Sequence, residues 1–416
     1  MRFRGSLFQI FEMTDPIQLI IISGVAPGPT GVGAVMSHLV SQAKRLREDG
    51  IADVDFVLGS GGLPLRRYFR EGRVLDALKH LFSAFMGEAR IRTYRFARPS
   101  LRTSYVVIHP QSLGFDWCIR FFKRATRPVW LYLMDASFFC IRSYNFIPGH
   151  TKPCLACLGG SFENSRLNNC RPFPRVSDSA GRFVKLLKEL VENGQVCLIA
   201  QTESQRELAY RHFGPRAIIE LAGLWGVDWI PPDNRTFTQK ETPLYGYDIV
   251  YHGLDVEAKG VTWALELAKA LPEYSFLFPF RRNSSKNNAP PNCRFKEMSW
   301  ESGLREAITA DAVTIVPSQW SAPIEGAVIK SLLYSSVTAV CVHPTMYVSE
   351  LSDHLVLKLN ADVTEAAAQL RAILRENKCH TKRGATQQFF KHFKDKNSDL
   401  LGNIIDITSN NHRADP

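Results

Sequence analysis

The chain has 416 residues, 45% of them apolar and 22% charged, and this ordinary globular composition excludes wholesale disorder. The length predicts two domains with large cores, and no apolar run approaches the roughly 20 residues needed to cross a bilayer. The net charge of +11 predicts an acidic partner, which nucleic acid, an anionic membrane or a nucleotide-linked substrate would each satisfy.

The N-terminal segment 1–16 has basic residues but neither a sustained apolar stretch nor a small-residue cleavage site, so we expect a cytoplasmic protein. Basic clusters occur at Leu65–Arg70, Phe280–Arg282 and Lys391–Lys396. They favour ordinary surface charge, with a peripheral membrane contact as the alternative. Because no helix-turn-helix, zinc-finger or RNA-recognition pattern accompanies them, we expect no nucleic-acid partner.

Apolar strands and helices alternate along the chain, which predicts α/β layers built on parallel sheets. The first half predicts strands at 18–25, 54–58, 105–109, 129–134, 195–200 and 217–221, with helices after residue 33, at 183–191 and at 204–212. After a Pro-rich polar stretch, the second half predicts strands at 248–252, 275–279, 312–316 and 337–342, with helices at 262–270, 301–309, 326–334 and 387–405.

These elements predict two Rossmann-like domains that face each other across a cleft, which is a preferred type of ligand site. The predicted boundaries are an extension at 1–16, a first domain at 17–230 with a Cys-rich insertion at 140–174, a linker at 231–246, a second domain at 247–380 and a C-terminal helix or tail at 381–416.

The turn Pro27–Gly33 follows the first strand and opens a helix, where glycines permit close backbone approach and the helix N-terminus attracts anions. It is not a Walker A loop, because Ala34 and Val35 replace the Lys and Ser/Thr of that motif. Met36 likewise replaces the third glycine of the dinucleotide fingerprint. Contact with a ligand and a merely tight turn both remain open.

The second domain opens with a strand, Gly253, and then Lys259-Gly260 at the start of a helix. A lysine at a helix N-terminus is unfavourable for the helix dipole unless an anion lies there too. Lys259 is therefore a candidate diphosphate ligand, and an exposed surface lysine is the alternative.

A third turn follows the strand at 312–316 and reads Pro317-Ser-Gln-Trp-Ser-Ala-Pro323. Together with Gly31-Val-Gly33 and the Gly253…Lys259-Gly260 opening, it resembles the retaining GT-B glycosyltransferases of family 4, over about residues 17–375. The resemblance implies an acceptor in the first domain, a nucleotide-sugar in the second, and hexosyl transfer with retention that requires no metal or other cofactor. Glycans, lipid-linked molecules and secondary metabolites are acceptors of that group.

Three positions depart from the pattern of that family. Leu254 replaces the phosphate-binding Arg, and Ala322 and Lys330 replace the two donor-loop glutamates. A lost charge-assisted phosphate contact costs about 1.5–3 kcal/mol. We expect Lys330 to compensate at phosphate and Glu325 to accept sugar hydroxyls, whereas a non-catalytic binding or scaffold protein with a degenerate donor site is the alternative. The predicted donor-binding residues are Gly31, Gly33, Gly253, Lys259, Ser318, Glu325, Gly326 and Lys330.

His109 and Asp135 each close a predicted strand of the first domain, and the resembling family often carries histidines at these positions. Since the carboxyl ends of parallel strands face the cleft, both are candidates for acid/base or acceptor-hydroxyl roles. A structural histidine is the alternative for His109. The predicted catalytic set is His109, Asp135, Lys259 and Glu325.

Four of the nine cysteines, Cys140, Cys154, Cys157 and Cys170, fall within 31 residues and include a Cys-x2-Cys pair. In a reducing cytosol this clustering predicts a structural Zn²⁺, with His150 as a substitute ligand. Buried free cysteines and an iron–sulfur cluster are the alternatives.

Overall fold

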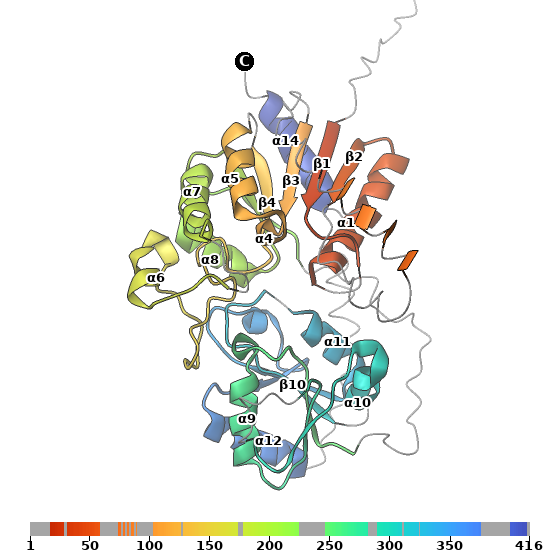
Figure 1. The fold of residues 1–416 in the computed structure, drawn as a ribbon, viewed down its shortest axis with the longest axis vertical. Helices are drawn as coiled ribbons and strands as arrows, with labels where there is room; N and C mark the ends of the chain where they lie inside the picture. Colours follow the sequence, from red (N-terminus) through yellow and green to blue (C-terminus); the bar gives the residue numbers. More distant parts are fainter. Residues whose placement is uncertain are drawn as a thin grey trace, which may run out of the picture.

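The structure is a computed structural model that describes residues 17–28, 31–58, 103–125, 128–173, 178–223, 246–281, 289–309, 312–323, 325–375 and 400–413, with a few positions between 74 and 89. The chain forms two α/β bodies, each built on a parallel sheet, and they lie one above the other in Figure 1. The segments 1–16 and 231–245, to which an extension and most of a linker were assigned, lie outside the described residues.

The first sheet has the order β2-β1-β3-β4-β5-β6, and every pairing in it is parallel. Its strands are β1 (Ile17–Ser23), β2 (Ala52–Leu58), β3 (Thr103–Ile108), β4 (Val129–Tyr132), β5 (Val196–Ala200) and β6 (Ile219–Leu221). Its helices are α1 (Gly31–Glu48), α4 (Pro110–Leu113), α5 (Phe115–Arg124), α6 (Glu163–Leu167), α7 (Ala180–Glu192) and α8 (Glu203–Phe213), with a 3-10 turn, η1, at Leu158–Gly160.

The continuous apolar run of β1 divides between the two faces of this sheet. Ile20 and Ile22 pack with helices α5, α7 and α8, whereas Leu19 and Ile21 pack with α1 and the C-terminal helix α14 (Leu400–Arg413). Burial on both faces explains why the strand sequence is uniformly apolar and does not alternate. Helix α14 thus packs on the first sheet (Figure 1), and most of the helix predicted at 387–405 lies outside the described residues.

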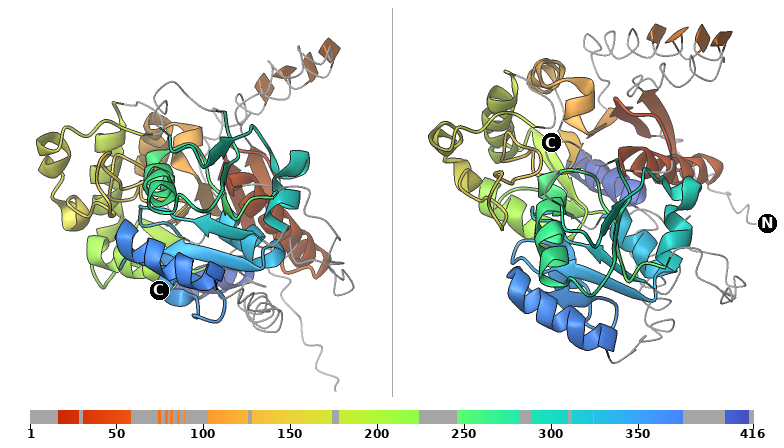
Figure 2. Two further views of the ribbon diagram at one scale, coloured as in Figure 1. Left: turned by 90° about the horizontal axis from the view of Figure 1, so that it is seen from below. Right: turned by 60° about the horizontal axis from the view of Figure 1, so that its bottom comes forward.

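The second sheet has the order β12-β11-β10-β7-β8-β9, also entirely parallel. Its strands are β7 (Ile249–Tyr251), β8 (Phe276–Phe278), β9 (Cys293–Phe295), β10 (Val313–Val316), β11 (Val337–Cys341) and β12 (Leu357–Leu359). Its helices are α9 (Val261–Ala270), α10 (Arg305–Thr309), α11 (Gly326–Tyr334) and α12 (Val363–Arg375), with tight turns η3 (Glu257–Lys259), η5 (Trp300–Leu304) and η6 (Tyr347–Glu350). Helices α9 and α12 cover one face of the sheet, while α10 and α11 cover the other (Figure 2).

A carboxylate of the second body also makes hydrogen bonds with the first body away from the sheets. The Glu350 carboxylate, from η6, accepts hydrogen bonds from the backbone N–H groups of Glu203 and Ser204 at 3.0 and 2.8 Å. These are the first two residues of α8, whose N-terminus carries unpaired donors and a partial positive charge. The carboxylate of one body therefore caps a helix of the other.

Candidate functional site

In the second sheet, β7 and β10 are neighbours although they are far apart in sequence. From β7 the strand order continues outward to β8 and β9, and from β10 it continues in the opposite direction to β11 and β12. In open parallel sheets, ligands bind at such a switch point, where the outgoing loops diverge. The loops that leave here are 252–260 and 317–325, and they contain four of the eight predicted donor-binding residues, Gly253, Lys259, Ser318 and Glu325.

These two loops are locked to each other. Gly260 has φ +80°, and a Cβ atom there would overlap the carbonyl group of Pro317. The N–H of Gln319 donates to the carbonyl of Ala258 at 2.8 Å. Beneath them, the buried Tyr251 hydroxyl lies 2.8 Å from the carbonyl of Leu254 and also close to that of Lys259, so the turn is held from below.

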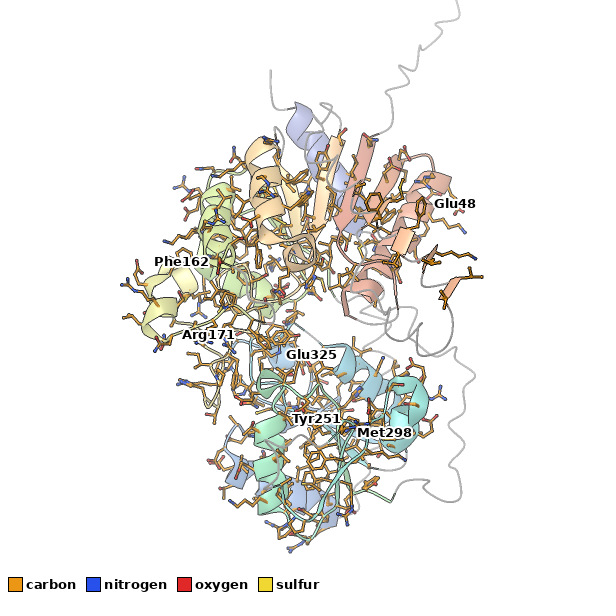
Figure 3. All side chains as sticks on the ribbon, viewed as in Figure 1. Glu48, Phe162, Arg171, Tyr251, Met298 and Glu325 are labelled. Atoms are coloured by element: carbon orange, nitrogen blue, oxygen red, sulfur yellow. The ribbon has the colours of Figure 1, made fainter. Side chains whose placement is uncertain are left out.

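Lys259 and Glu325 form the centre of the site. The Lys259 Nζ lies 2.7 Å from Glu325 Oε1, and the two side chains are only 13% and 9% exposed. The same oxygen accepts hydrogen bonds from Ser318 Oγ at 2.7 Å and Trp320 Nε1 at 3.1 Å. A buried charge pair needs such additional hydrogen bonds to offset its desolvation. Figure 3 shows Glu325 where the two bodies meet.

Two aromatic rings enclose the lysine. Its Nζ lies 4.9 Å from the ring centroid of Tyr144 and 4.9 Å from that of Trp320, within the range of cation–π attraction. The two rings are 4.6 Å apart. Tyr144 belongs to the Cys-rich segment of the first body and Trp320 to the donor loop of the second, so both bodies contribute to the surroundings of the ammonium group.

Asn145 fixes this junction. Its side-chain amide donates to Ser321 Oγ at 3.0 Å, and its Oδ1 accepts from the Ser321 N–H at 3.0 Å. Asn145 is completely buried. The neighbouring Phe146 packs in a cluster with Val316, Trp320 and Met346 of the second body. The Cys-rich segment therefore joins the first body to the donor loop.

His109 and Asp135 line one cavity of the first body, at the ends of β3 and β4. Asp135 Oδ2 accepts from the Gln111 side chain at 3.1 Å, and Oδ1 accepts from the Ser137 N–H at 2.9 Å. His109 has φ 55°, an unusual conformation for a residue other than glycine that is often found near functional sites. The structure thus brings together these two predicted residues.

The pKa of Tyr144 links that cavity to the lysine. Burial raises it above its ordinary value, the charge of Lys259 lowers it, and the charges of Asp135 and Glu325 raise it further. Asp135 and the Lys259–Glu325 pair therefore act electrostatically on one phenol. Candidates from the two bodies form a single charged neighbourhood, which the separate motifs did not indicate.

The glycine turn lies at the corresponding switch point of the first sheet, between β1 and β3. A Cβ at Gly33 would lie 3.1 Å from the N atom of Gly28, so this turn needs glycine for its own packing, while Gly31 has φ +52° and open space around it. Gly253 also lacks space, since a Cβ would lie 2.6 Å from the Tyr251 hydroxyl oxygen.

Lys330 lies elsewhere on the rim, although Gly326 and Lys330 both belong to α11. Its Nζ is 4.7 Å from the ring centroid of Trp300, whose ring stacks on His252. Burial lowers the pKa of Lys330, and burial together with the charge of Lys330 lowers that of His252 to about 3. His252 is thus a neutral histidine whose Nδ1 lies 2.9 Å from Ser331 Oγ.

Four residues of the site were not predicted as site residues: Tyr144, Asn145, Trp320 and Ser321. Trp320 and Ser321 lie inside the recognised Pro317–Pro323 turn, and this turn was the only signal for them. Tyr144 and Asn145 lie between the cysteines, where nothing in the sequence indicates contact with a loop more than 170 positions away.

No protein-family profile matches this sequence, and no curated protein matches it. Solved structures do share its fold. The sucrose-phosphate synthase of Thermosynechococcus elongatus is 13% identical, with a TM-score of 0.57 over 93% of this chain and 98% of its own. Anabaena HepE, solved with UDP and glucose, is 11% identical, with a TM-score of 0.53 over 93% and 99%.

A third structure, the UDP-forming α,α-trehalose-phosphate synthase of Burkholderia vietnamiensis, is 11% identical, with a TM-score of 0.52 over 94% of this chain and 99% of its own. Such matches cover both bodies and both sheets. The sequence-based prediction of fold is therefore confirmed: the chain has the GT-B fold, two Rossmann-like α/β domains built on parallel six-stranded sheets.

Proposed function

We propose that this protein is a glycosyltransferase that moves a sugar, of the hexose type, from a nucleotide-sugar to an acceptor. The observation that carries the proposal is the buried Lys259–Glu325 pair at the switch point of the second sheet, with the ammonium group against the ring of Tyr144 from the first body. The GT-B neighbours support it, since two of their names state that UDP is bound or formed.

In this proposal Lys259 binds the donor diphosphate and stabilises the charge that develops on the leaving group. Diphosphate would take the ammonium group away from Glu325, whose carboxylate then accepts hydrogen bonds from sugar hydroxyls. Ser318, which donates to the Glu325 carboxylate, would be a second polar contact for the sugar. The N-terminus of α11 at Gly326 would supply backbone N–H donors. Lys330 would contact a more distant part of the donor.

On the acceptor side, His109 and Asp135 would orient or deprotonate the attacking hydroxyl. Gly31 and Gly33 would let the backbone of the first domain approach the substrates. Attack from the face of the departing diphosphate would give retention, the stereochemical outcome that the family resemblance implies. We propose no metal or other cofactor in the transfer step, because Lys259 can carry the charge compensation.

A degenerate donor site is the competing proposal, and one observation favours it. Lys259 is nearly buried, and it already contacts the Glu325 carboxylate and two aromatic rings. A scaffold protein could therefore retain the Lys259–Glu325 pair for stability alone. A glycosyltransferase would turn over a nucleotide-sugar, whereas a scaffold protein would not.

The test is the release of nucleoside diphosphate from a panel of UDP-, GDP-, ADP- and TDP-sugars, with donor hydrolysis as the readout that requires no acceptor. We expect Lys259→Ala to lower turnover about 100-fold and Glu325→Gln to lower it as well. Lys269→Ala, an exposed lysine on α9, is the matched control and should leave turnover unchanged. Full activity in both site variants would refute the site assignment, and donor binding without any turnover would favour the scaffold.

We further propose that the acceptor is reached at the cytoplasmic surface of an anionic membrane. Large apolar side chains are exposed at helical spacing at Leu75, Leu78, Phe82 and Phe85, with exposures of 55–75%. The preceding sequence carries four arginines, Arg66, Arg67, Arg70 and Arg73. Apolar side chains beside basic residues match an anionic lipid surface. No helix among the described residues is long and apolar enough to span a membrane.

Sedimentation with vesicles tests this contact. The protein should sediment with phosphatidylglycerol vesicles and much less with phosphatidylcholine vesicles. Phe82→Glu with Phe85→Glu should abolish sedimentation, whereas Leu167→Glu, at an exposed apolar position on α6, should not. Equal sedimentation of the double variant and the parent protein would contradict the proposal.

A further inference from the structure

The four clustered cysteines meet at one place in the fold. Cys140, Cys154, Cys157 and Cys170 all line a single cavity, together with Arg142, Phe146 and small polar side chains. They come from the loop after β4, the turn before η1 and the end of α6, so the chain makes a closed loop around the cavity. The other described cysteines, such as Cys118 and Cys293, do not line it.

The thiols are also electrostatic neighbours. Burial, and to a smaller extent the neighbouring Cys154 and Cys170 thiols, raise the pKa of Cys157 to about 11. The pKa of Cys140 is raised by burial first and also by each of the other three thiols. A metal ion binds cysteine as the thiolate, so an ion in the cavity that these four thiols line would displace their protons.

With the side chains in their present rotamers, the described residues include no group of three or more His, Cys, Asp or Glu side chains arranged to hold a metal ion. All four are free thiols, and Cys154 and Cys170 are only partly buried, so they can rotate at χ1 without breaking a packed core. Structural zinc sites characteristically form together with the loop that carries the ligands.

We propose that this cavity binds one Zn²⁺ through Cys140, Cys154, Cys157 and Cys170. The four thiolates form a tetrahedral set without an open position, which is the arrangement of structural zinc. Four protons leave as the four Zn–S bonds form, and no oxidation or reduction takes place. The spacing of Cys154 and Cys157, two residues apart, is that of a zinc knuckle.

The zinc also acts on the donor site. Cys154 makes two hydrogen bonds with Asn145. The Cys154 N–H donates to the Asn145 backbone carbonyl at 2.6 Å, and the Cys154 carbonyl accepts from the Asn145 side chain at 3.0 Å. The same Asn145 side chain bonds Ser321 of the donor loop. An ion on Cys154 therefore holds the residue that joins the two bodies, and it positions Tyr144 against Lys259.

The first test is metal content. Protein purified under reducing conditions and supplied with zinc should contain about one zinc per chain after dialysis. Cys154→Ser with Cys157→Ser should lose more than about tenfold in zinc affinity, measured with a chromophoric chelator. Cys293→Ser, a buried cysteine of β9 in the other body, is the matched control and should bind zinc normally. Less than about 0.1 zinc per chain in the parent protein, or iron in its place, would overturn the proposal.

The second test does not depend on whether a variant folds. Zinc should protect Cys154 and Cys170 of the parent protein from iodoacetamide, and a chelator should expose them, with the modified peptides located by mass spectrometry. The two rates should differ at least about tenfold, because only the free thiolate reacts. Alkylation at the same rate with and without zinc would show that these thiols hold no ion.

Discussion

At the residue scale, the chemistry that we propose for the site depends on Glu325. The family pattern places carboxylates at the positions of Ala322 and Lys330, and this chain instead carries its carboxylate at the N-cap position of α11. From there it accepts hydrogen bonds from three side chains at once. Glu325 lies at a different position from those carboxylates, and it contacts the lysine that we assign to phosphate.

The sequence predicted a donor-site role for Glu325, which stays a prediction, but it did not predict the contact of Glu325 with Lys259. The two residues are 66 positions apart, and their contact depends on two loops closing against each other. The structure places Lys330 over the ring of Trp300, so we propose that it contacts a more distant part of the donor and does not join Lys259 at phosphate as expected.

Gly260 gives a prediction at this scale. Gly260→Ala should cost about 3 kcal/mol or more of unfolding free energy, because the new Cβ meets the Pro317 carbonyl in a left-handed backbone. The control is Gly194→Ala, which has φ +71° but open space and should cost only about 1–2 kcal/mol. Urea unfolding of the two variants measures the difference. Equal losses would mean that the two loops are not packed as described.

At the element scale, the predicted strands and helices agree with the structure wherever apolar runs were long. Helix α11 has the predicted bounds, and β1, β5 and β10 differ by one or two residues at an end. Strands β9 and β12 were missed because each has a charged residue at its centre, Arg294 or Lys358, and so lacks the uninterrupted apolar run of the equally short β7 and β8. Helix 301–309 was predicted as one element, but it begins as a π-type turn with Gly303 at φ 118°.

The Cys-rich segment is the element whose role the sequence did not reveal. Its cysteines indicated a structural metal site in the first domain. The structure adds that the same segment carries Tyr144, Asn145 and Phe146 to the donor loop. Such long-range contacts depend on the tertiary fold, and one sequence without aligned relatives carries no signal for them.

At the scale of the whole molecule, two parallel sheets present their carboxyl ends to each other, and each has its own switch point. Alternating apolar strands and helices sufficed to predict this architecture, since a parallel sheet buried on both faces leaves a strong pattern. The identity of the donor and acceptor depends on a few side chains at the rim, which the architecture does not determine.

The most direct test of the account is calorimetric titration of a panel of nucleoside diphosphates into the parent protein, Lys259→Ala and Glu325→Gln. Diphosphate and the Glu325 carboxylate would compete for one ammonium group. We therefore predict that at least one ligand binds the parent, that Lys259→Ala weakens its binding at least about tenfold, and that Glu325→Gln tightens it about tenfold. No binding to the parent, or equal affinity in the parent and Lys259→Ala, would contradict the assignment of this pair to the donor site.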